Sequence, residues 1–203
     1  IEGKGDGVAF NMRDYVKAAC ERYTSIPGVK PLKHAQTPFC SDGTLTAADD
    51  EVQGELAASA CSVLMKDLWA ARLGRPDLTK AITALASKVS KWSRNHDRML
   101  YRLMSYMWTT RDYELVGYVN DPLEELWLEL YVDADWAGDR EDKYSKNGGI
   151  LFLAGPNSRF PLAWVSKKQT SCSRSTTESE VVALAHSLFL EAIPMMTLWS
   201  RLV

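Results

Sequence analysis

The sequence has few of the residues that hold metals or form disulfides, with four cysteines and three histidines among 203 residues. The cysteines lie far apart and form no Cys-x-x-Cys pair, which argues against a zinc site or a redox dithiol. They are Cys20, Cys40, Cys61 and Cys172. We expect reduced, mostly buried thiols and an intracellular location, cytoplasmic or nuclear. No chemistry is assigned to the histidines His34, His96 and His186.

Strong net charge and long apolar runs are also absent. The formal net charge is −2, so overall charge points neither to nucleic acid nor to a solvated acidic tail. No apolar run approaches the roughly 20 residues of a membrane helix, and the N-terminus lacks the layout of a signal peptide. We therefore predict no membrane insertion and no secretion. The start at Ile1 without Met and the apolar end "WSRLV" suggest a piece of a larger protein.

What is present begins with helical periodicity. Asn11 can cap a helix over about 12–23, and residues 25–50 are rich in Pro, Gly, Asp and Thr without periodicity, which predicts a linker or long surface loop. Apolar residues then recur at helical spacing from Gly54, and "GRPD" at 74–77 interrupts the run.

A second helix of this middle region follows from about Asp77, and a third is capped by Asn95 or Asp97. Positions 80–111 are strongly basic, with Asp97 as their single acid. The basic residues are Lys80, Lys88, Lys91, Arg94, Arg98, Arg102 and Arg111. They form either solvated helix faces or a surface that follows phosphates, and composition does not separate the two.

The last third of the chain changes to strands. The alternating segment at 126–133 and the segments "ILFLAG" at 150–155 and "FPLAWVSK" at 160–167 predict three strands, and 175–199 predicts a long helix. This order predicts an α/β (α+β) class, in which a helical region precedes the opening of a sheet domain.

Acidic residues stand at the first strand's end and at the long helix's start. Ser175 and Glu178 form a capping box, whereas Glu180 has no role in the cap and is either a surface acid favoured by the helix dipole or a functional group. Asp133 closes the strand, and Asp135 and Asp139 are expected on the loop beyond it.

Carboxylates from a strand end and a helix start can meet if the helix packs across that strand. Two such groups repel each other, so they commonly share a proton or hold a divalent cation. Oxygen ligands select Mg²⁺ or Mn²⁺, and Mg²⁺ is commonly bound together with phosphate oxygens. The pattern is therefore suited to phosphate-ester chemistry.

Two stretches, "YVDADWAGDREDKYSKNGGILFLAG" and "LAWVSKKQTSCSRSTTESEVVALA", closely resemble the ribonuclease H region of copia-type retrotransposon Pol polyproteins. Upstream, "YVKAACERY" resembles the end of the reverse-transcriptase thumb, and 54–90 resembles the helices of the connection region. The resemblance implies a thumb remnant and linker at 1–36, a helical connection region at 37–124, and an incomplete ribonuclease H-like domain at 125–203. That domain would hold three antiparallel strands and the first helix of a mixed sheet.

The resemblance also implies a function and its residues. Asp133 and Glu180 would be catalytic metal ligands for two Mg²⁺ (or Mn²⁺) ions that hydrolyse the RNA strand of RNA–DNA hybrids. Thr176 and Thr177 would contact the hybrid. Arg98 and Arg102 are predicted to bind nucleic acid.

The sequence departs from the family where further metal ligands would follow. Residues 181–203 contain Glu191 as their single acid, so we expect this chain by itself to be inactive. The alternative is a non-catalytic remnant that acts as a structural or interaction subunit. In either case the remainder of the Pol polyprotein, or another protein, is expected to cover an open sheet edge. Trp136 and Trp164 are expected in the core rather than stacked on bases.

Overall fold

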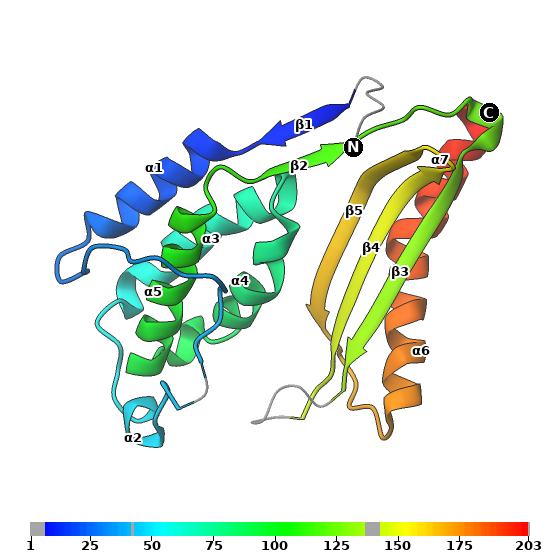
Figure 1. Cartoon of the computed structure of the whole chain (residues 1–203). Coiled ribbons are helices and arrows are strands. Elements are labelled where there is room, and N and C mark those ends of the chain that lie inside the picture. The colour runs from blue at the N-terminus through cyan, green and yellow to red at the C-terminus, as the bar shows by residue number, and fades with distance from the viewer. Residues whose placement is uncertain (1–6, 42, 137–142, 203) are drawn as a thin grey trace. The chain divides into compact units, whose positions relative to one another are not determined.

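Figure 1 shows a computed structural model of the chain, which describes residues 7–41, 43–136 and 143–202. The chain forms two compact units: a helical unit, Phe10–Leu115, and a sheet unit that joins Val116–Val203 to Ile1–Ala9. A helical region that is followed by three antiparallel strands and a long helix confirms the predicted α+β class. The boundaries predicted at 36/37 and 124/125 describe segments of a polyprotein, and they stay predictions.

The helical unit contains five α-helices joined by turns and two short 3₁₀ segments in the described residues. They are α1 (Arg13–Thr24), α2 (Ala47–Asp50), α3 (Ala57–Leu73), η1 (Pro76–Leu78), α4 (Thr79–Ala86), η2 (Val89–Lys91) and α5 (Arg94–Thr109). The helices form because apolar side chains recur every three or four residues and can be buried together. The buried set includes Leu64, Leu78, Ile82, Leu85, Leu100, Leu103, Met104 and Met107.

The "GRPD" interruption holds a buried cation. Arg75 is 2% exposed and binds both carboxylate oxygens of Asp77, with Nε–Oδ1 and Nη2–Oδ2 distances of 2.9 and 2.7 Å. Its guanidinium also donates to the carbonyl and hydroxyl oxygens of Thr110, at 3.0 and 2.6 Å. The motif thus ties η1 to the end of α5, because a fork of N–H groups can satisfy several acceptors at once.

The predicted cap of α5 was wrong. Ser93 begins the helix in a capping box with His96, whose Nδ1 accepts from the Ser93 N–H at 2.9 Å. Asn95 instead donates to the carbonyl oxygen of Thr46 at 2.7 Å. Asp97 accepts from the backbone N–H of Glu55 at 2.7 Å, just before α3. These two side chains connect α5 to distant segments, which local sequence does not reveal.

A small sheet was not predicted. Strands β1 (Val8–Asn11) and β2 (Glu114–Gly117) pair in a two-stranded sheet. Each has four residues, too few to show a periodic pattern. After them, η3 (Leu123–Glu125) leads into the main sheet.

The main sheet has the order β3-β4-β5 and is antiparallel throughout. Its strands are β3 (Trp127–Asp135), β4 (Lys146–Gly155) and β5 (Ser158–Lys168), all longer than predicted. Asp135 is the last residue of β3 and pairs with Lys146, so its predicted place on a loop was wrong. Asp139 lies outside the described residues.

The long C-terminal helix is confirmed, with a change of pitch in its middle. It consists of α6 (Thr176–Ser187), a π-helical segment η4 (Leu188–Ala192) and α7 (Ile193–Leu202). The Ser175 cap is also confirmed, because its Oγ accepts from the Glu178 N–H at 3.1 Å. The Glu178 carboxylate reaches back to the Arg174 N–H at 2.7 Å.

Small residues let α6 approach the sheet closely. Ser179, Ala183 and Ser187 follow one another at four-residue spacing and are all fully buried, and α6 packs against β3 and β4. A Cβ placed on Gly149 of β4 would lie 2.6 Å from Ser187 Oγ. The face of the sheet at Gly149 is therefore the one that α6 covers.

The opposite side of the helical run is apolar and exposed. Its exposed residues are Val181, Leu184, Phe189, Leu190, Ile193, Met196 and Leu198. Among the described residues, one helical run, Thr176–Arg201, could cross a membrane by length and composition alone. A single run of this kind is weak evidence, so the absence of membrane insertion stays a prediction.

Candidate functional site

Asp133 lies near the end of β3 and pairs with Gly148, while its neighbour Val132 pairs with Gly149. Directly opposed residues of an antiparallel pair share a face of the sheet, and successive residues alternate between faces. Val132 and Gly149 thus point toward α6, and Asp133 points to the other face. Asp133 is exposed on that face.

Glu180 lies in the second turn of α6, directly after the buried Ser179. One residue corresponds to about 100° around a helix, so Glu180 sits beside the seam that contacts the sheet. Its side chain is exposed. The helix that carries Glu180 does pack against the strand that carries Asp133, as the sequence argument required.

The two carboxylates are not joined in the described structure. No hydrogen bond connects them there, and Asp133 projects from the face that α6 leaves open. Within the described ranges there is no group of three or more His, Cys, Asp or Glu side chains placed to hold a metal ion. The residues present therefore do not by themselves fit a two-ion magnesium site. Their predicted roles as catalytic groups and ligands stay predictions.

A buried polar network positions the start of α6. Gln169, 4% exposed, donates through Nε2 to Asn147 Oδ1 at 2.7 Å and to the Ser179 carbonyl at 2.9 Å. Its Oε1 accepts from Ser173 Oγ at 2.8 Å. Gln169 therefore links β4, the loop before α6 and the first turn of α6. Gln169 lies within the stretch "LAWVSKKQTSCSRSTTESEVVALA", but nothing in the local sequence indicates this role.

Thr176 and Thr177, predicted to contact the hybrid, are exposed in the first turn of α6. Trp136, expected in the core, is 46% exposed and donates its indole N–H to the Ser173 carbonyl at 3.2 Å. That expectation was wrong, because β3 ends at the residue before Trp136. An exposed aromatic ring and two hydroxyls thus surround the helix start.

Arg98 and Arg102 belong to the helical unit, where both hold the loop before α3. Arg98 Nη1 lies 2.7 Å from Asp49 Oδ2 and donates to the Thr44 carbonyl at 3.1 Å. Arg102 donates to the Thr37 carbonyl at 2.8 Å and to its hydroxyl at 3.1 Å. The predicted long loop is thereby fastened to α5.

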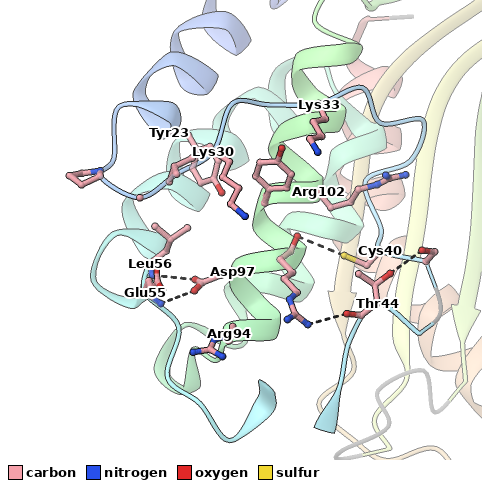
Figure 2. A pocket seen from close by; sticks show the side chains of 16 residues that line it. Tyr23, Lys30, Lys33, Cys40, Thr44, Glu55, Leu56, Arg94, Asp97 and Arg102 are labelled. Atoms are coloured by element: carbon pink, nitrogen blue, oxygen red, sulfur yellow. Dashed lines mark hydrogen bonds between the residues drawn. The ribbon is translucent and has the colours of Figure 1, made fainter. Parts of the chain in front are cut away.

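Both arginines also line a pocket of about 540 Å³ in the helical unit (Figure 2). Arg94, one turn earlier on α5, and two lysines from the loop after α1, Lys30 and Lys33, line it too. Sequence reasoning missed the lysines, although "VKPLK" places them three residues apart in a proline-containing segment. Of the basic residues at 80–111, the three on this face of α5 meet at the pocket, and the others do not line it.

The cysteines are free, as predicted, but less buried than expected. Cys20 is buried and Cys40 partly so, whereas Cys61 and Cys172 are exposed. Burial raises the pKa of the Cys20 thiol to about 12. Burial also raises the pKa of Cys40, partly offset by Arg102 and Arg98. Both remain protonated at neutral pH, which makes them poor nucleophiles.

No family model and no solved structure matches the chain. Among curated proteins, the retrovirus-related Pol polyprotein from transposon RE2 of Arabidopsis thaliana is 35% identical over 113 residues, 56% of this chain and 7% of that protein. The Pol polyprotein from transposon TNT 1-94 of Nicotiana tabacum is 26% identical over 180 residues, 86% of this chain and 13% of that protein.

A different kind of relative is a secreted RxLR effector protein 161 from Plasmopara viticola. It is 34% identical over 113 residues, which make up 56% of this chain and 75% of the effector. The chain spans only a small part of the Pol polyproteins that it matches. By its sequence, the chain is a homologue of one segment of the copia-type retrotransposon Pol polyproteins.

Proposed function

We propose that this chain corresponds to the part of a Pol polyprotein in which a ribonuclease H domain begins. The parent protein would hydrolyse the RNA strand of RNA–DNA hybrids, and the chain alone would be inactive. The observation that carries the proposal is the packing of α6, with Glu180 near its start, against β3, with Asp133 near its end. This order of elements is the one that the family resemblance requires.

The Gln169 network supports the same proposal. It fixes the first turn of α6 to β4 through a side chain that is almost fully buried. A binding or catalytic group on that turn is thereby held in place, which functional sites need. The backbone that carries Thr176, Thr177 and Glu180 is fixed to β4 by these hydrogen bonds.

Two carboxylates on different sides of the sheet do not make a metal site. Mg²⁺ commonly takes six oxygen ligands in near-octahedral geometry, of which several are water molecules. In the parent, a metal site that uses Asp133 and Glu180 would need further carboxylates supplied by other residues. No metal-dependent step follows from this chain alone.

Cleavage of a labelled RNA–DNA hybrid in Mg²⁺ tests the proposal. We expect no cleavage by this chain, cleavage by the longer parent, and loss of cleavage by at least about 100-fold in the parent with Asp133→Asn. Asp135→Asn, on the same strand face, serves as the matched control and should retain activity. Equal cleavage by the parent and its Asp133→Asn variant would remove Asp133 from the mechanism.

The alternative is a structural or interaction subunit without catalysis. It is favoured by the effector relative, because a segment like this one makes up most of a protein whose name describes no polyprotein. It would also use the exposed apolar side of α6 and α7. Retained hybrid cleavage in the parent argues against it.

The partner that we propose is another part of the polyprotein. Among the described residues, β3 has one unpaired edge, whereas the outer edge of β5 is bridged to Tyr118 at Arg159. Unpaired strand edges and exposed apolar surfaces commonly mark protein contacts. A neighbouring segment that pairs with β3 would cover its edge. The free cysteines support an intracellular location for the assembly.

A further inference from the structure

The pocket of the helical unit concentrates positive charge in a chain whose net charge is negative. Figure 2 shows Lys30 and Lys33 on the loop after α1, and Arg94 and Arg102 on α5, around one space. Two carboxylates, Glu55 and Asp97, line it as well. The basic side chains outnumber them, whereas the chain as a whole carries −2.

Asp97 compensates little of that charge. One of its oxygens accepts from the Glu55 N–H at 2.7 Å, and the other from the Leu56 N–H at 3.2 Å and the Trp92 indole N–H at 2.7 Å. These three donors occupy the carboxylate at the start of α3. Its role is therefore to satisfy backbone and indole donors rather than to neutralise a pocket cation.

Three cations of the pocket, Arg102, Lys30 and Lys33, have no carboxylate partner among the described residues. The other two, Arg94 and Arg98, share the carboxylate of Asp49, at 3.5 and 2.7 Å. Arg102 is held by the carbonyl and hydroxyl of Thr37, which are neutral, so its charge stays uncompensated. Lys30 and Lys33 are exposed and make no ion pair in the described structure.

The loop that carries the lysines is fastened before any ligand arrives. Tyr101 of α5 donates its hydroxyl to the Pro31 carbonyl at 2.7 Å, between the two lysines in sequence. The Arg102 contacts with Thr37 hold the same loop further along. Ordering a loop in advance lowers the entropy cost of binding.

We propose that this pocket binds the phosphate groups of a nucleotide. Uncompensated lysine and arginine side chains around one cavity are suited to a multiply charged anion. A volume of about 540 Å³ lies within the range of small-ligand sites and suits a single nucleotide rather than a duplex. A free nucleoside phosphate and a nucleotide within a strand offer the same chemistry. The inference goes beyond the nuclease proposal and does not use Asp133, Glu180, Thr176 or Thr177.

Titration calorimetry on the full chain, at one low ionic strength, tests it with ADP, inorganic pyrophosphate and a short single-stranded oligodeoxynucleotide. We expect Lys30→Ala/Lys33→Ala to weaken binding by about tenfold for each lost charge-assisted contact. Lys30→Arg/Lys33→Arg keeps both charges and should retain binding. Lys17→Ala/Lys91→Ala removes two exposed lysines outside the pocket and should bind like the original chain.

The three probes separate the sources of the phosphate. Loss of ADP and pyrophosphate binding in the alanine pair identifies a free nucleotide, and loss of oligonucleotide binding alone identifies a strand. The proposal is overturned if the original chain binds none of the probes, or if the control pair loses as much affinity as Lys30→Ala/Lys33→Ala. Circular dichroism melting should show that all variants fold, since neither pocket lysine has an ion-pair partner to lose among the described residues.

Discussion

At the residue scale, two buried charged groups of the helical unit differ in how they are satisfied. Arg75 has acceptors for its guanidinium on Asp77 and Thr110. Asp67 of α3 is fully buried, and neither carboxylate oxygen has a hydrogen-bond partner in the described structure. The first group stabilises the fold when charged, and the second is tolerated only when neutral.

Replacing Arg75 should be costly because its partners would lose their donors. We expect Arg75→Met to lower the free energy of unfolding by about 3 kcal/mol in urea titrations, since it breaks a largely buried ion pair. Arg72→Met, which removes an exposed arginine near the end of α3, is the control. A difference between the two variants below about 0.5 kcal/mol would contradict the structural role of Arg75.

Asp67 should make stability depend on pH. Burial raises the pKa of its carboxyl to about 8, against a smaller lowering by Lys66, from an ordinary value of 3.8. The unfolded chain therefore releases this proton near pH 4 and the folded chain only near pH 8. The contribution is complete below pH 4 and is lost as pH rises toward 8, by about 1.4 kcal/mol per pH unit.

Asp67→Asn should remove that dependence. Its stability relative to the original chain, measured by urea unfolding from pH 5 to 8, is expected to rise with pH. Asp14→Asn, at an exposed position of α1, should show no such trend. A parallel pH profile for Asp67→Asn and the original chain would show that Asp67 does not titrate as its burial implies.

At the element scale, the close approach of α6 to the sheet depends on Gly149. Because a Cβ there would lie 2.6 Å from Ser187 Oγ, we expect Gly149→Ala to destabilise the sheet unit by about 1–3 kcal/mol through overpacking. Ser187→Ala removes that oxygen, which has no hydrogen-bond partner in the described structure. The double variant should recover much of the loss in thermal unfolding. No recovery would mean that α6 and β4 do not meet at this point.

At the scale of the whole molecule, the two proposals lie in different compact units. The carboxylates Asp133 and Glu180 belong to the sheet unit, and the cationic pocket belongs to the helical unit. Failure of the hybrid-cleavage experiment would therefore leave nucleotide binding open, and the reverse also holds. Both remain consistent with the sequence similarity to Pol polyproteins.

Periodicity predicted most of the elements, because burial of an apolar face requires spacing that is visible in the residues themselves. Helices α3, α4 and α5, the three strands and the long last helix follow from it, whereas the short helix α2 lies in the segment predicted as a loop. Short β1 and β2 carry no such signal, and the cap of α5 was assigned to Asn95 or Asp97 rather than to Ser93. Several neighbouring polar residues can cap the start of α5, and the local sequence does not show which of them does.

The sequence by itself determined the class of fold, the similarity to Pol polyproteins and the residue types near each candidate site, since these depend on spacing and on motifs. The tertiary structure alone decided that Asp133 faces away from α6 and that Lys30 and Lys33 join α5 at one pocket. Strand register sets which face a side chain occupies, and loop anchoring sets which distant residues meet. Neither is encoded in a local pattern, because both arise from contacts between segments far apart in the chain.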